Sequence, residues 1–241
     1  MKPIALVTGA SGGIGAAVAK RFIDRSYAVV LQYHTHPEAV QTIAASFPNG
    51  ASYLCTPCNL TDDSSVEDLR QTIHLRLGHV SVLINCAGVA LPQMLLTDTT
   101  EADYARVFEA NVHGTVRMCK AFYDDLRENH GAIVNISSIW GVAGGSCESL
   151  YSATKAAVIG LTRSLAAELG PSGVRVNCVA PGWIDTAMTQ HLPEEAKQAY
   201  IDDTPLGRIG TPKDVADAVF YLANASYVTG QTLRVDGGYT L

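Results

Sequence analysis

The chain has 241 residues, of which 47% are hydrophobic and 17% are charged, and its formal net charge at pH 7 is −6. This length and composition are typical of one large globular domain with a full core. The acidic balance argues against a nucleic acid or an anionic membrane as the main partner. No apolar run is long enough to cross a bilayer and the first residues do not resemble a signal peptide, so we expect a cytoplasmic protein.

Short apolar runs alternate along the chain with longer amphipathic stretches. The runs predict strands at 3–8, 28–33, 52–56, 82–84, 132–137, 174–180 and 231–235. Helices are predicted over about 15–26, from 37, from 61, over about 100–127, over 151–169 and from 211. Strands that alternate with helices predict an α/β fold, a single-domain, Rossmann-like doubly wound parallel β-sheet with helices on both faces, over residues 1–241.

Local signals mark several of these helix starts. Thr100 and Thr211 are expected to cap their helices, and Pro37 suits a first helical turn. The spacing Ser64-x-x-Glu67 predicts a capping box. The interval 185–210 is polar and weakly periodic, and it follows a strand at the edge where such sheets bind ligands. We expect it to form a substrate lid, whose proteolytic cleavage should change when cofactor is bound.

Glycines at 9, 12, 13 and 15 lie between the first strand and the first helix. Glycine lets a backbone approach a pyrophosphate closely, and the helix N-terminus offers free N–H groups and a positive dipole end. The spacing differs from the G-x-G-x-x-G fingerprint. A tight glycine turn that binds nothing is the alternative interpretation.

Ser138, Tyr151 and Lys155 form a candidate proton-transfer site. Tyr151 and Lys155 are four residues apart, so on a helix they lie one turn apart on the same face. A cation in this position should lower the pKa of the phenol, which is near ~10 in a free tyrosine. Ser138 could hold a substrate oxygen beside it, so the three residues would form a proton-transfer site for a carbonyl or an alcohol. An ordinary helix that carries a Tyr and a Lys is the alternative.

The chain contains six cysteines, and Cys55 and Cys58 have the C-x-x-C spacing of redox and zinc sites. No second pair and no nearby histidine cluster completes a metal site in the sequence. We therefore expect buried, reduced thiols and no bound metal.

Several segments together resemble the short-chain dehydrogenase/reductase family over essentially the whole chain, and most closely its 3-oxoacyl-[acyl-carrier-protein] reductases. These segments are Thr8–Gly15, Asn85–Gly88, Asn111, Ser138, Tyr151-x-x-x-Lys155, Pro181-Gly182 and 227–238. The combination is more specific than any one motif, because all the elements occur in the same order.

The resemblance implies a role for each matching position. Tyr151 is the general acid, Lys155 lowers its pKa and binds the nicotinamide ribose, Ser138 orients the carbonyl, and Asn111 kinks its helix and holds a water of the proton relay. Asn59 and Leu60 match positions that meet adenine. The implied cofactor-binding set is Gly9, Ser11, Gly13, Ile14, Gly15, Tyr33, His34, Thr35, Asn59, Leu60, Asn85, Ala87, Gly88, Tyr151, Lys155, Pro181, Gly182, Ile184 and Thr186.

The end of the second predicted strand indicates which cofactor is used. An NAD enzyme would carry Asp or Glu there to bind the ribose 2′-hydroxyl, but the sequence is Gln32-Tyr33-His34-Thr35. Nothing there repels a 2′-phosphate, so we expect NADP(H). The phosphate would rest on Tyr33, His34 or Thr35, since no arginine stands in the glycine loop.

Two features leave the substrate open. Relatives that dock acyl carrier protein have basic residues at the site entrance, where this chain has Glu128-Asn129 and Ser172. The segment Gly145–Glu148 instead resembles relatives that reduce a ketone on a modified lysine of elongation factor P. The expected activity is reduction of a 3-oxoacyl thioester, and the elongation factor P ketone is the alternative.

The resemblance also implies a homotetramer. A non-catalytic, NADP-sensing regulator on the same fold is a further alternative. It is disfavoured because a sensor does not need Asn111, Ser138, Tyr151 and Lys155 together.

Overall fold

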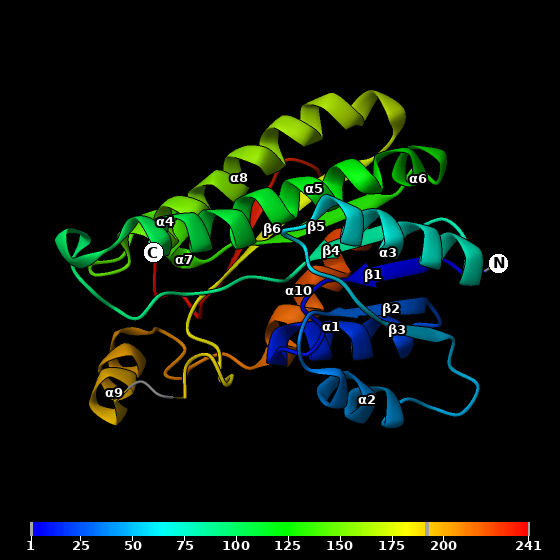
Figure 1. The fold of residues 1–241 in the computed structure, drawn as a ribbon. Coiled ribbons are helices and arrows are strands. Elements are labelled where there is room, and N and C mark those ends of the chain that lie inside the picture. The colour runs from blue at the N-terminus through cyan, green and yellow to red at the C-terminus, as the bar shows by residue number, and fades with distance from the viewer. Residues whose placement is uncertain (1, 191–192, 241) are drawn as a thin grey trace.

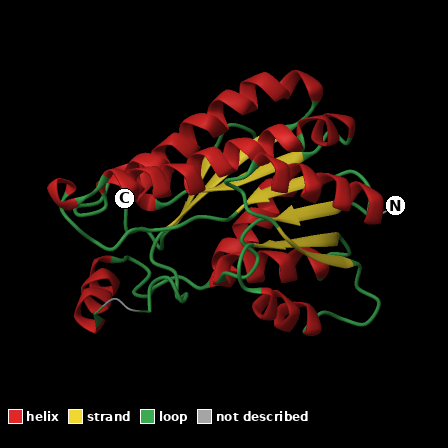
Figure 2. Ribbon diagram, in the orientation of Figure 1, coloured by secondary structure: helices red, strands yellow, loops and turns green. Residues whose placement is uncertain are grey.

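The computed structural model describes residues 2–190 and 193–240 and contains one sheet of seven parallel strands (Figures 1 and 2). The strand order is β3-β2-β1-β4-β5-β6-β7, so the direction of winding reverses between β1 and β4. The strands are β1 Ile4–Val7, β2 Ala28–Tyr33, β3 Tyr53–Pro57, β4 Val82–Asn85, β5 Ala132–Ile136, β6 Arg175–Pro181 and β7 Thr232–Val235. The predicted fold class is confirmed, and the reversal is the point beside which such sheets bind ligands.

Helices cover both faces of the sheet (Figure 1). One face packs against α1 (Gly13–Ile23), α2 (Pro37–Ala45) and α10 (Pro212–Asn224). The other packs against α3 (Asp63–Arg76), α5 (Gly114–Ala121), α6 (Tyr123–Glu128) and α8 (Ser149–Leu169). The central strands β1, β4 and β5 are buried at every residue, which explains their continuous apolar runs.

The predicted helix over 100–127 is divided. α4 (Glu101–Phe108) leads into a π-helical turn over Glu109–His113 before α5 begins. A π-turn inserts one residue into the helix and is found mostly at functional sites. Asn111 lies within this turn, as the predicted kink required.

Two of the three predicted caps are confirmed. Thr100 and Thr211 each form a capping box with an aspartate three residues later. The box at Ser64 is wrong, because the side chain of Asp62 accepts the hydrogen bond from the Ser64 N–H and so caps α3. Glu67 pairs with Arg70 instead, at 2.6 Å.

The interval 185–210 is more regular than its sequence pattern suggested. It contains α9 (Glu194–Asp203), whose Tyr200 is buried. His191 and Leu192 of this interval lie outside the described residues. Within 2–190 and 193–240, no helix combines the length and apolar character that crossing a membrane requires.

The C-x-x-C residues do not face one another. Cys55 packs against the core beneath α1 and α2, and Cys58 belongs to the core beneath α3. Burial raises the pKa of both thiols, so both stay protonated at neutral pH. The spacing does not bring the two sulfurs to one site.

Candidate active site

Ser138 and Tyr151 are brought together by the packing of α7 (Ile139–Ala143) against α8. Ser138 is the N-cap of α7, and its hydroxyl accepts a hydrogen bond from the Trp140 N–H at 3.1 Å. Gly141 permits the close packing, because a Cβ there would lie 2.7 Å from the carbonyl carbon of Lys155. A larger residue at 141 would separate Ser138 from Tyr151.

Lys155 is a buried cation beneath the phenol. Its Nζ donates a hydrogen bond to the Ile136 carbonyl at 3.0 Å and lies 5.6 Å from the centre of the Tyr151 ring. Burial lowers the pKa of Lys155. The side chain therefore stands one helical turn from the phenol, as the sequence predicted.

The predicted fall in the Tyr151 pKa is not found in the protein alone. Burial raises the pKa of Tyr151 to about 12, although a hydrogen bond with Ser138 acts in the opposite direction. Desolvation disfavours the phenolate more than its neighbours stabilise it. The nearby Glu148 carboxylate raises the pKa further. In this state the phenol is a proton donor at neutral pH, not a base.

Asn111 is buried behind the site. Its amide oxygen accepts from the Val89 N–H at 2.8 Å, and its amide nitrogen donates to the Val89 carbonyl at 2.9 Å and to the Thr154 hydroxyl at 3.1 Å. It thereby joins the π-turn to the chain after β4 and to α8. A Cβ on Gly88 would lie 3.1 Å from its Oδ1 and 3.2 Å from Lys155 Nζ, so a larger residue there would press on both side chains.

The glycine loop forms a cradle at the N-terminus of α1. Gly9 has a φ of +63°, and a Cβ there would lie 2.7 Å from the Ala87 Cα. A Cβ on Gly15 would lie 2.4 Å from the Gly9 carbonyl oxygen. The N-cap, Gly12, has no side-chain hydrogen bond to the helix, so the first turn keeps free N–H groups. This arrangement fits the pyrophosphate of a dinucleotide.

A cavity of about 940 Å³ joins the cradle to Ser138, Tyr151 and Lys155. Seventeen of the nineteen predicted cofactor residues line it, since only Tyr33 and Asn85 of that set are missing from its walls. Tyr33 packs against the core, and Asn85 donates to the buried Asn135 side chain at 2.8 Å. Neither side chain lines the cavity of the protein alone, and their part in cofactor binding stays a prediction.

Gln32 is a supporting residue that the motifs did not reveal. Its side chain accepts from the Gly9 N–H at 2.9 Å and donates to the Cys58 carbonyl at 2.7 Å. It therefore ties the glycine loop to the ends of β2 and β3. Its position at the end of an apolar strand was the only signal in the sequence.

The far part of the cavity is aromatic and acidic. Tyr200 and Tyr239 stack with ring centres 4.1 Å apart. The Trp140 ring packs edge-on against Tyr239, with ring centres 6.2 Å apart. Among the residues lining the cavity, Glu148 and Asp203 carry carboxylates, and Lys155 is the only Lys or Arg. Burial raises the pKa of Glu148, opposed by a hydrogen bond with Gln93. Apart from Glu148, none of these residues belonged to a motif.

Comparison with known proteins agrees with this site. The family model described as Enoyl-(Acyl carrier protein) reductase matches residues 9–240. Carbonyl reductase family member 4 of Danio rerio is 41% identical over 241 residues, which cover 100% of this chain and 99% of the relative. The 3-oxoacyl-[acyl-carrier-protein] reductase FabG of Escherichia coli (strain K12) is 37% identical, over 98% of this chain and 96% of the relative.

A solved structure described as ElxO with NADP bound superposes with a TM-score of 0.91 and 33% identity, and 99% of each chain is covered. A second, in which a tyrosine of ElxO is replaced by phenylalanine and NADPH is bound, gives a TM-score of 0.90 at the same identity. Full-length similarity at these identities, together with the match of the family model, leads to one conclusion. The chain belongs to the short-chain dehydrogenase/reductase family of oxidoreductases.

Proposed function

We infer that this protein is an NADP(H)-dependent reductase that converts a ketone to an alcohol. The inference rests on one observation, that Ser138, Tyr151 and Lys155 line the same cavity as the glycine cradle. The NADP and NADPH of the ElxO structures and the reductase names of the relatives support it.

In this mechanism the bound cofactor supplies a hydride to the carbonyl carbon. Tyr151 donates its phenolic proton to the carbonyl oxygen, and the Ser138 hydroxyl orients that oxygen toward the phenol. Lys155 binds the ribose next to the reacting ring and supports the phenolate that remains after proton transfer. Asn111 fixes the π-turn and so the position of Thr154 on α8.

We expect NADPH to be preferred to NADH, modestly. His34, Thr35 and His36 line the cavity at the end of β2, and Glu148 and Asp203, the acidic residues of its wall, belong to the other end of the site. No carboxylate therefore repels a 2′-phosphate, but no arginine binds it in a fork either. The Michaelis constants for the two cofactors test this expectation, and a lower constant for NADH would contradict it.

The names of the relatives make a 3-oxoacyl thioester the first substrate to test. The experiment follows the oxidation of NADPH with acetoacetyl-CoA, with Tyr151→Phe as the control. Turnover that disappears in the variant supports the proposal. Turnover that persists would remove Tyr151 as the acid, whereas tight NADPH binding without turnover would direct attention to a different ketone.

A specific observation favours a second candidate, a ketone that carries a cationic amine, as on a modified lysine of elongation factor P. The far part of the cavity combines the Tyr200, Tyr239 and Trp140 rings with the Glu148 and Asp203 carboxylates. Aromatic faces and carboxylates both attract an ammonium group, and they offer nothing to an anionic carrier. Glu148 is half-buried, so a cationic partner would restore favourable interactions that burial has removed.

The two candidates separate in one comparison. An amino ketone and its uncharged N-acetyl analogue are assayed with wild type, Glu148→Gln and the control Glu168→Gln, on the exposed far end of α8. If the amine binds at Glu148, Glu148→Gln raises KM for the amino ketone by about tenfold and leaves that of the analogue unchanged. Equal effects on both ketones would refute the cationic assignment without affecting the reductase.

We also propose that the protein is a homotetramer and that 185–210 closes over bound ligands. The outer edge of β7 has no strand partner among the described residues, and its Leu233 is exposed. Light scattering coupled to size-exclusion chromatography measures the mass of the assembly, and a monomer would refute the homotetramer. Limited proteolysis with and without NADPH tests the closure, and unchanged cleavage in 185–210 would count against a lid.

A further inference from the structure

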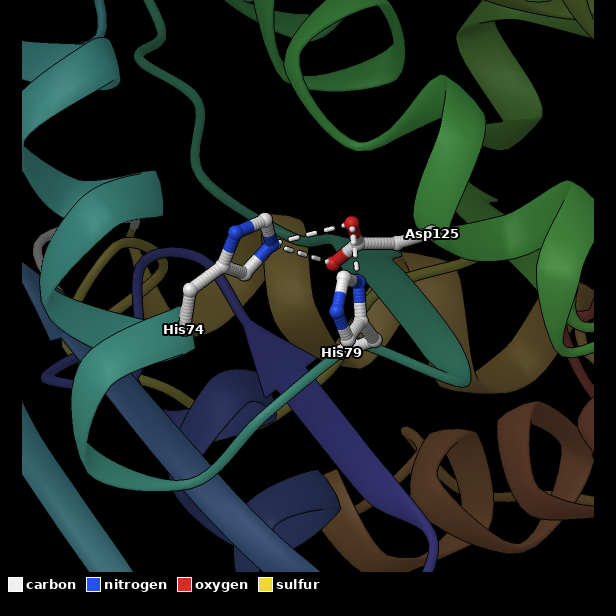
Figure 3. A group of neighbouring side chains, drawn as sticks. All are labelled: His74, His79 and Asp125. Carbon is white, nitrogen blue, oxygen red and sulfur yellow. Dashed lines mark hydrogen bonds and ion pairs between the residues drawn. The ribbon is translucent and has the colours of Figure 1, made fainter.

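Two histidines and a buried aspartate meet on the side of the molecule away from the active site. His74 is on α3, His79 is in the turn before β4, and Asp125 is on α6 (Figure 3). This turn precedes the amino end of β4, whereas the cavity lies at the carboxyl ends of the strands. The cluster therefore has no part in the proposed reduction.

Both imidazoles point at the Asp125 carboxylate (Figure 3). His74 Nε2 lies 2.9 Å from each carboxylate oxygen, and His79 Nδ1 lies 3.1 Å from Oδ1. The Val80 N–H donates to Oδ2 at 2.9 Å, which fixes the carboxylate from the backbone. The side chain of Asp125 is only 5% exposed, and that of His79 is 54% exposed. The group is thus anchored from within and open to solvent on one side.

The ligand atoms have a spacing that a metal ion could use. The three atoms lie within 4.8 Å of one another. The Glu128 carboxylate lies 3.6 Å from His79 Nδ1 and could supply a fourth ligand. In a tetrahedral site with metal–ligand distances of about 2.0–2.1 Å, ligand atoms are about 3.3 Å apart. Three of the separations, 2.9 Å for His74–Asp125, 3.1 Å for His79–Asp125 and 3.6 Å for His79–Glu128, lie within about 0.5 Å of that value.

We propose that His74, His79 and Asp125, with Glu128 as an outer ligand, bind a divalent transition metal ion of the Zn²⁺ class. Two imidazoles and two carboxylates suit Zn²⁺, Co²⁺ or Ni²⁺, while Mg²⁺ and Ca²⁺ prefer oxygen ligands alone. The ion would join α3, the turn before β4 and α6, three segments that meet at this edge. It would be a structural ion, distant from the cavity.

The contact between Arg70 and His74 indicates how the ring proton of His74 must move when the ion binds. Its Nη1 lies 3.4 Å from His74 Nδ1, and a guanidinium can only donate, so in the metal-free protein Nδ1 accepts and Nε2 carries the proton. Metal binding at Nε2 moves that ring proton to Nδ1, where it faces Arg70. Glu67 holds the Arg70 guanidinium in this position by two bonds, at 2.9 and 2.6 Å. Arg70 therefore opposes the metal.

The test is calorimetric titration of the full chain with Zn²⁺, and with Mg²⁺ for comparison. We expect one Zn²⁺ per chain, no Mg²⁺, and a higher Tm with Zn²⁺. His79→Ala removes an exposed ligand without burying an unpaired group and should weaken Zn²⁺ binding at least about tenfold. His113→Ala is the matched control, because His113 pairs with Glu109 at 2.6 Å but belongs to no such cluster among the residues that the structure describes.

Two further measurements distinguish this site from metal binding by thiolates and from a histidine pair that binds no metal. The Co²⁺ complex should lack the charge-transfer bands of thiolate ligands, which separates this site from the free cysteines. Arg70→Met removes the opposing donor and should tighten Zn²⁺ binding, whereas a merely structural histidine pair would give no binding to tighten. Absent Zn²⁺ binding, or binding that His79→Ala leaves unchanged, would overturn the proposal.

Discussion

The phenol of Tyr151 should remain protonated far above neutral pH when the protein is free of cofactor. Burial raises its pKa from 10.0 to about 12. The rise of two pKa units corresponds to about 2.7 kcal/mol against the phenolate. A pH of 7 is about five units below this pKa, so forming the phenolate costs about 7 kcal/mol. Roughly one molecule in 10⁵ then has an ionised Tyr151.

This magnitude predicts how the rates of the two directions depend on pH, if the bound cofactor leaves the pKa of Tyr151 raised. Donating a proton to a ketone begins from the abundant phenol, whereas accepting one from an alcohol begins from the rare phenolate. Reduction by the enzyme should therefore vary little with pH near neutrality, and alcohol oxidation should become faster as pH rises. Ser138→Ala removes the hydrogen bond that lowers the pKa and should shift the oxidation profile to still higher pH.

The assay is an ultraviolet titration of the cofactor-free protein, with the spectrum of Tyr151→Phe subtracted from that of wild type. The difference isolates one phenol among the ten tyrosines of the chain. We expect no phenolate from Tyr151 below pH ~10. A transition near pH ~7–8 would refute this reasoning, because it would mean that Lys155 outweighs burial even without cofactor.

Three substitutions test the supports of the site. Asn111→Ala removes the partner of the half-buried Val89 N–H and carbonyl and one of the two partners of the buried Thr154 hydroxyl, and should lower the free energy of unfolding by about 2 kcal/mol or more in urea titrations; a loss below about 1 kcal/mol would contradict this. Gly141→Ala places a Cβ 2.7 Å from the backbone of Lys155 and should lower kcat, whereas Gly160→Ala on α8 meets nothing within 4 Å and should leave kcat unchanged. Arg175 donates to three carbonyls at the end of α10, so Arg175→Met should lower Tm by several degrees more than Arg175→Lys, and equal losses would argue against the fork.

The sequence predicted those parts of the fold that depend on neighbours along the chain. Buried parallel strands appear as apolar runs, and the caps at Thr100 and Thr211 use residues three positions apart. At the start of α3 both Asp62 and Ser64 are possible N-caps, and the side chain of Asp62 forms the cap. α9 was missed because only one of its side chains, Tyr200, is buried, so its sequence has few repeating apolar positions. Tyr200 stacks on Tyr239, a partner far along the chain that local patterns do not reveal.

The pKa of Tyr151 shows a second limit of local reasoning. The spacing to Lys155 correctly predicted a cation one turn away. It could not predict how deeply α7 and the chain after β4 would bury the phenol, and burial decides the sign of the shift. The motif thus identified the acid but not its protonation equilibrium in the free protein.

The two halves of the cavity differ in what holds a ligand. The cradle around Gly9 and Gly15 works through backbone N–H groups and missing side chains, so its glycines are visible as a motif. The far half works through side chains from separate segments, among them Trp140, Glu148 and Tyr239, which no spacing links. A motif can therefore specify hydride and proton transfer while the wall that selects the ketone differs between relatives. For this reason the comparison of an amino ketone with its neutral analogue, more than any further comparison of motifs, decides between the two substrates.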